Sequence, residues 1–102
     1  MKVYIIGIGL IGGSMALDIK AFNKDAVIIG VDANENHLEH AVELGIIHEK
    51  AELKEVVDAD FVIVAVPVDT ALELLPKVLH LVSEDTLVFD VGSLRVQYVK
   101  QW

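Results

Sequence analysis

The sequence contains no cysteine, only two prolines and no cluster of basic residues. The absence of cysteine excludes disulfides, thiolate catalysis and zinc sites built on cysteine. Eight basic residues stand against sixteen acidic ones, so the net charge is −8. Such a surface repels polyanions on average, and we do not expect nucleic-acid binding. No apolar run reaches the ~18 residues of a membrane-spanning helix, so we expect no membrane association through a transmembrane segment.

Length and hydropathy favour one folded domain. The chain has 102 residues, of which 54% are hydrophobic. These values suit a single compact domain with a real core and argue against disorder. The first apolar run follows Met1 and Lys2 directly, which leaves no room for a signal peptide. We therefore expect a cytoplasmic protein.

Short apolar runs alternate with amphipathic segments along the chain, a pattern typical of parallel strands joined by helices. Strands are expected at residues 3–6, 26–31, 46–47, 61–66 and 86–89. Helices are expected over residues 11–22, from Asn34 or Glu35 to Gly45, and over 53–57. A further helix is expected to begin at an Asp69 cap, to break near Leu75 because of Pro76, and to start again and run through Val82. The residues from Leu94 to Trp102 are expected to begin a last helix. Right-handed crossovers then predict a single α/β domain over residues 1–102, with a doubly wound parallel sheet in the strand order 3-2-1-4-5.

A glycine-rich turn follows the first expected strand and opens the first helix. Residues 7–12 are GIGLIG, the G-x-G-x-x-G spacing of dinucleotide-binding turns. In that motif Gly7 permits a tight exit from the strand, Gly9 lets the backbone approach a pyrophosphate, and Gly12 lets the helix pack close to the strand. The free N–H groups at the helix start hold the phosphates. The alternative is a turn that serves packing alone.

Asp32 ends the second expected strand, twenty residues after Gly12. A carboxylate in this position accepts hydrogen bonds from the ribose hydroxyls of NAD and repels the 2′-phosphate of NADP. No arginine lies near Asp32 in the sequence to reverse that preference, so we expect NAD. The alternative is a solvated strand end. Ser93 follows the fifth strand, where its hydroxyl would face a substrate, cap a helix, or do both.

Four segments together closely resemble the prephenate dehydrogenase family. They are residues 7–14 (GIGLIGGS), 30–33 (GVDA), 65–69 (AVPVD) and 90–93 (DVGS), and the resemblance extends over essentially the whole chain. The resemblance implies NAD-dependent oxidative decarboxylation of prephenate to 4-hydroxyphenylpyruvate in tyrosine biosynthesis. Some relatives take arogenate instead.

Carried over position by position, the resemblance implies a cofactor site within this chain. The residues it assigns are Gly7, Gly9, Leu10, Ile11 and Gly12 at the pyrophosphate, Asp32 at the ribose, and Ala65, Val66 and Pro67 on the nicotinamide side. Ser93 matches the serine that faces the substrate, and Arg95 stands where the family usually has lysine. The family's catalytic histidine, its substrate arginine and its helical dimerisation domain come later than Trp102. We therefore expect the chain to bind NAD without turning over prephenate, and the intact protein to form a homodimer.

Two other functions remain open on the sequence alone. The chain could be the cofactor domain of a β-hydroxyacid-type dehydrogenase, which shares the glycine turn, or a non-enzymatic module that senses NAD(H). A metal site is not expected. His37 and His40 have a spacing that can bind metal, but the neighbouring glutamates favour an ordinary charged helix face.

Overall fold

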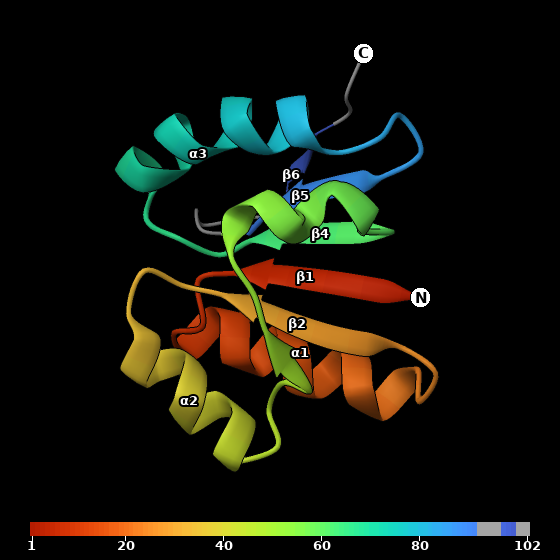
Figure 1. Cartoon of the computed structure of the whole chain (residues 1–102), viewed down its shortest axis with the longest axis vertical. Helices are drawn as coiled ribbons and strands as arrows, with labels where there is room; N and C mark the ends of the chain where they lie inside the picture. The colour runs from red at the N-terminus through yellow and green to blue at the C-terminus, as the bar shows by residue number, and fades with distance from the viewer. Residues whose placement is uncertain (92–96, 100–102) are drawn as a thin grey trace.

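One sheet organises the whole domain. This computed structural model describes residues 1–91 and 97–99, in which six strands pair in the order β3-β2-β1-β4-β5-β6. The strands are β1 (Lys2–Ile6), β2 (Val27–Val31), β3 (Glu49–Lys50), β4 (Phe61–Val64), β5 (Leu87–Asp90) and β6 (Gln97–Val99). The first five are parallel, and β6 runs antiparallel to β5 (Figure 1). The doubly wound order predicted from the sequence is confirmed.

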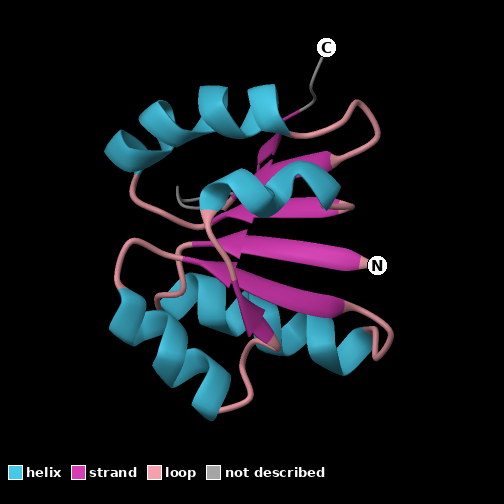
Figure 2. Cartoon of the chain, viewed as in Figure 1, coloured by secondary structure: helices cyan, strands magenta, loops and turns pink. Residues whose placement is uncertain are grey.

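Helices cover both faces of this sheet (Figure 2). The helices α1 (Leu10–Phe22) and α2 (Glu35–Glu43) pack on one face, and the 3-10 helix η1 (Leu53–Asp58) and α3 (Val68–Leu81) pack on the other. The first core contains Val3, Ile5, Ile28, Ile63, Ala16 and Leu38, and the second contains Tyr4, Ile6, Val62, Val88, Val56 and Val78. Strands buried on both faces explain the continuous β-branched runs of the sequence. In the part of the chain that the structure describes, no helix has both the length and the apolar character needed to cross a membrane.

Helix α3 runs past Pro76 without a break, so the interruption expected near Leu75 is wrong. Proline lacks the N–H that would bond to the carbonyl of Leu72, four residues earlier. Pro76 and Leu72 both lie on the exposed side of the helix, where water can satisfy that carbonyl. On the opposite side Ala71 and Val78 are buried against the sheet. This packing keeps the helix continuous, since tertiary contacts supply most of the stability of such helices.

The third strand lies later than predicted. It consists of Glu49–Lys50 rather than residues 46–47. The N–H groups of Ile46 and Ile47 turn back instead to the carbonyl of Ala41, at 2.9 and 3.4 Å. This reversal follows from Gly45, which ends α2 with a φ of +74°. The two isoleucines therefore belong to the helix end.

Two other expectations at element ends are also corrected. Helix α3 begins at Val68 with Pro67 in the N-cap position, so Asp69 lies in the first turn and does not cap the helix. The segment expected to start a helix at Leu94 contains β6 in its described part. Tyr98 and Val99 favour strands, and the edge of β5 offers the backbone groups with which residues 97–99 pair.

Candidate functional site

The parallel strands end at one edge of the sheet, and the segments that follow them enclose a cleft, here termed the carboxyl-edge cleft. The N–H of Gly7 bonds to the carbonyl of Val31 at 2.7 Å. The N–H of Ala65 bonds to the carbonyl of Ile6 at 2.8 Å, so the segments stay side by side beyond the strands. The cleft measures about 780 Å³, within the usual range for cofactor sites. Its lining includes Gly7, Gly9, Asp32, Ala65, Val66 and Pro67, six of the nine residues that the sequence predicts as cofactor contacts.

The glycine turn is packed against backbone atoms at Gly7 and Gly12 and is open at Gly9. Gly7 has a φ of +97°, and a Cβ there would lie 2.6 Å from the carbonyl oxygen of Ala65. A Cβ on the buried Gly12 would lie 2.0 Å from the carbonyl oxygen of Gly7. At Gly9, in contrast, no heavy atom comes within 4 Å of the position that a Cβ would take. The turn therefore leaves open space at one point, beside the start of α1.

Helix α1 begins at this open point without a cap. Its first backbone hydrogen bond runs from the N–H of Gly13 to the carbonyl of Gly9, at 2.8 Å. The preceding N–H groups have no partner within the helix. No side chain caps this end, and its first turn carries no acidic residue. The exposed donors and the positive end of the helix dipole are suited to an anion.

Leu10 and Ile11 contribute to this helix start through their backbone. Their side chains are 89% and 50% exposed, and neither is among the described residues that line the cleft. Gly12 lies beneath the turn rather than in the cleft wall. The structure thus separates the three predicted contacts that shape the helix start from the six that line the cleft.

Asp32 joins the glycine turn to the loop after β2. One carboxylate oxygen accepts the N–H of Ile8, and the other accepts the N–H of Asn34, both at 2.9 Å. The Asp32 side chain is 16% exposed. It is therefore an anchored group rather than a solvated strand end. Since each carboxylate oxygen has two lone pairs, both oxygens can accept a further hydrogen bond from the cleft.

The first turn of α2 brings further polar groups to the cleft. Asn34 caps the helix by accepting the N–H groups of Asn36 and His37, at 3.0 and 3.3 Å. The cap positions His37 with its Nδ1 3.8 Å from an Asp32 oxygen. Glu35 also lines the cleft, and it pairs with Lys50 of β3. The sequence predicts an ordinary charged helix face for His37. The sequence signal for its place beside the cleft is its position in the first helical turn after a strand that ends in Asp32.

The outer walls of the cleft come from segments far apart in the sequence. These lining residues are Leu38, Ala51, Glu52, Leu53, Thr70 and Leu74. Most are apolar, as in the walls of ordinary small-molecule sites. Glu52 lines the cleft and forms a reciprocal cap with Glu55 at the start of η1. No local pattern marks these residues, because the packing of η1 and α3 on the sheet brings them together.

Ser93 and Arg95 lie outside the described residues. The register of β5 sets Asp90 beside Val64, so the preceding strand does end at the carboxyl edge. Within residues 1–91 and 97–99, no three metal-ligating side chains gather closely enough to hold an ion.

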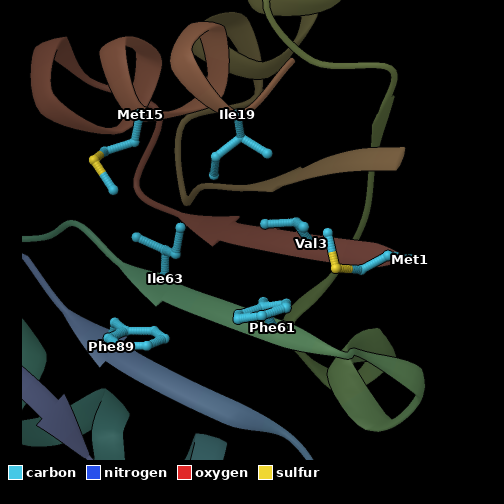
Figure 3. Close-up of a pocket in the computed structure, with 7 residues that line it drawn as sticks. All are labelled: Met1, Val3, Met15, Ile19, Phe61, Ile63 and Phe89. Carbon is cyan, nitrogen blue, oxygen red and sulfur yellow. The ribbon is translucent and has the colours of Figure 1, made fainter. Parts of the chain in front are cut away.

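A second hollow, here termed the apolar hollow, lies between α1 and the sheet (Figure 3). It measures about 320 Å³ and is lined by Met1, Val3, Met15, Ile19, Phe61, Ile63 and Phe89. The rings of Phe61 and Phe89 stack, with centroids 6.3 Å apart and an interplanar angle of 14°. All of the described lining residues are apolar, so no side chain there can orient a polar ligand. The carboxyl-edge cleft is the candidate site.

Comparison with known proteins identifies relatives of this chain. Residues 15–102 match the family model described as prephenate dehydrogenase, nucleotide-binding domain. The chain is 36% identical over 100 residues to the prephenate dehydrogenase of Bacillus subtilis, covering 95% of this chain and 27% of that protein. It is 41% identical over 102 residues to that of Lactococcus lactis, covering 97% of this chain and 28% of that protein. The chain thus spans little more than a quarter of the length of these relatives.

Solved structures show the same relationship in three dimensions. Synechocystis arogenate dehydrogenase superposes with a TM-score of 0.82 at 31% identity, over 91% of this chain and 33% of that one. Prephenate dehydrogenase from Aquifex aeolicus, in complex with hydroxyphenyl propionate and NAD+, superposes with a TM-score of 0.82 at 36% identity, over 88% of this chain and 32% of that one. The resemblance seen in the sequence motifs is confirmed. The chain belongs to the family of prephenate dehydrogenase nucleotide-binding domains.

Proposed function

We propose that the carboxyl-edge cleft binds NAD and that this chain is the cofactor domain of a dehydrogenase acting on prephenate or arogenate. The observation that carries the proposal is the meeting of three features in one cleft: the uncapped start of α1, the open space at Gly9, and the anchored carboxylate of Asp32. The N–H groups at the start of α1 would hold the pyrophosphate. Asp32 would accept hydrogen bonds from the ribose hydroxyls.

The charges around the cleft favour NAD over NADP. Asp32, Glu35 and Glu52 are carboxylates among its lining residues. A 2′-phosphate placed beside Asp32 would meet this negative field, whereas two ribose hydroxyls would find acceptors. The pyrophosphate would lie at the other end of the cleft, where the first turn of α1 carries no acidic residue. The residues present therefore fit a cofactor with phosphates at one end and free ribose hydroxyls at the other.

The reaction we propose is the oxidative decarboxylation of prephenate or arogenate in tyrosine biosynthesis. Bound NAD would supply the hydride acceptor, with Ala65, Val66 and Pro67 flanking its nicotinamide and Ser93 facing the substrate. The Aquifex relative that holds NAD+ also holds hydroxyphenyl propionate, which supports an aromatic substrate class. Because the chain spans only about a quarter of its curated relatives, we assign the proton-accepting base, the substrate arginine and a homodimer interface to a further, helical domain of the intact protein. We place the protein in the cytoplasm.

Calorimetric titration of the 102-residue chain with NAD and with NADP tests the cofactor assignment. We expect NAD to bind at least about tenfold more tightly than NADP, a difference of about 1.4 kcal/mol. Asp32→Asn should weaken NAD binding by about tenfold and narrow the gap to NADP, since a neutral amide no longer repels phosphate. Asp25→Asn is the matched control, because Asp25 is exposed before β2, at the opposite edge of the sheet. Equal affinity for the two cofactors, or no binding of either, would refute the assignment.

A further inference from the structure

His37 is a polar side chain of the cleft to which the proposed function gives no role. Its imidazole is 57% exposed, and its Nδ1 lies 3.8 Å from an oxygen of Asp32. This separation is too long for a direct hydrogen bond. It is short enough for the charge on one group to be felt by the other. The neutral imidazole is therefore not hydrogen-bonded to the carboxylate, and a protonated one lies within ion-pair distance of it.

His37 also separates two hollows. On one side it lines the carboxyl-edge cleft, and on the other it lines a hollow of about 350 Å³ between the starts of α1 and α2, here termed the interhelix hollow. The interhelix hollow is lined by Ile8, Gly9, Gly13, Asn36, His37, His40, Ala41 and Ile46. Gly9 lines both hollows, so they adjoin at the glycine turn.

The two hollows differ in charge. Three carboxylates line the cleft, whereas none of the described residues that line the interhelix hollow carries one. The groups that can become charged there are the imidazoles of His37 and His40, and the uncapped start of α1 lies beside them. A phosphate would be repelled by the first environment and attracted by the second.

We infer that His37 determines how strongly the site discriminates against NADP, because its protonated imidazole binds the 2′-phosphate in the interhelix hollow. The inference rests on the proposed function, since it requires the ribose to lie beside Asp32. Because the imidazole of His37 lies beside that carboxylate, a phosphate on the same ribose would come near it. Discrimination against NADP is therefore strong when the imidazole is neutral and weak when it is charged.

The charged and titratable groups around His37 come from several elements. Asp32 lies at the end of β2, Glu35 and His40 on α2 itself, Lys50 on β3, and Glu52 before η1. Lys50 is paired with Glu35 and with Glu39, so its charge is balanced locally. Histidine gains its charge as the pH falls from 8 to 5, a range over which carboxylates remain ionised. The preference for NAD should therefore decrease toward acidic pH.

The test is the ratio of the dissociation constants of NADP and NAD, measured by calorimetry at about pH 6 and pH 8. In the unaltered chain we expect this ratio to fall by about tenfold at the lower pH, because one charge-assisted hydrogen bond changes an affinity by about that factor. His37→Gln should remove most of that fall. His80→Gln, on the exposed last turn of α3, should keep it, because His80 lines neither hollow. The 2′-phosphate itself loses charge near pH 6, so variants are compared at the same pH. Circular dichroism confirms that each variant is folded.

The outcomes separate this inference from the proposed function. If NAD binds but the ratio is the same at both pH values, or falls equally in His37→Gln, the inference is overturned while the cofactor assignment stands. If the fall disappears only in His40→Gln, the phosphate contact belongs to His40 and the inference is likewise overturned. If neither cofactor binds at either pH, the proposed function fails, and the inference fails with it.

Discussion

The carboxyl-edge cleft and the apolar hollow are built on the same sheet but from different parts of the strands. The cleft lies where the strands end, so its walls include backbone N–H groups, three carboxylates and the three-residue turns that follow the strands. The apolar hollow lies over the strands themselves, where backbone groups pair with neighbouring strands and only side chains remain (Figure 3). The comparison shows why recognition chemistry collects at the ends of a parallel sheet, while its faces offer packing surface.

The two regions also differ in how close the backbone comes to their surface. The floor of the cleft rests on glycines whose missing Cβ atoms would collide with backbone, whereas the apolar hollow is lined by side chains that can shift. A substitution in the cleft floor should therefore disturb both stability and binding. A substitution in the apolar hollow should disturb stability alone.

The largest effect is expected at the cleft floor. In Gly12→Ala the new Cβ would lie 2.0 Å from the carbonyl oxygen of Gly7, so the backbone must move. We expect the free energy of unfolding to fall by about 3 kcal/mol and NAD binding to be lost. Urea denaturation and calorimetry measure the two effects. The control is Gly13→Ala, where a Cβ meets no atom within 4 Å beyond its own helix, and a gain of about 0.5–1 kcal/mol is expected. Equal stability of the two variants would contradict the steric argument.

A smaller loss is expected in the apolar hollow. Phe61→Ala removes the stacked partner of Phe89, and since Phe61 is only partly buried, the loss should be about 2 kcal/mol. The affinity for NAD should stay as it is, because Phe61 does not line the cleft. Phe22→Ala, at a side chain that is 91% exposed, is the control and should change stability by less than about 0.5 kcal/mol. A loss of NAD affinity in Phe61→Ala would show that the two regions are coupled.

The smallest effect concerns the amino edge of the sheet and appears only at alkaline pH. Burial, together with a 2.7 Å hydrogen bond to Asp58, raises the pKa of Tyr4 well above its usual range. A raised pKa means that the neutral phenol is favoured in the folded state. The contribution of Tyr4 to the free energy of unfolding is therefore complete below about pH 10 and is lost as the pH rises above that value. We expect stability to fall above pH 10 by at most about 1.4 kcal/mol per pH unit through this group.

Tyr4→Phe isolates this contribution. The variant should lose less stability than the unaltered chain between about pH 9 and pH 11, as measured by urea denaturation, because it has no phenol to ionise. Comparison of the two chains cancels the titration of the lysines that lie away from Asp58, the carboxylate that Tyr4 shares with Lys2. Parallel curves for the two chains would show that Tyr4 does not carry the alkaline sensitivity.

Much of the fold and part of the site could be predicted because their signals are local. Apolar runs of strand length alternate with helical segments, and right-handed crossovers leave few ways to order them, so the order 3-2-1-4-5 followed. The backbone at Gly7 and the contact beneath Gly12 exclude other residues on steric grounds, which makes the glycine spacing informative. Asp32 was recognisable because it ends a strand at a set distance from that turn.

What the tertiary structure decided depends on partners distant in the sequence. Helix α3 continues past Pro76 because its buried side packs on the sheet, and local rules alone predict a break there. The strand β6 forms where the edge of β5 is available to pair with it. His37 and Glu52 belong to the cleft because α2 and η1 begin at the carboxyl edge, although their sequence context is that of a solvated helix. The sequence by itself determined the turn and the acid, since each obeys a local steric or spacing rule. Only packing across the sheet determined which other side chains surround them.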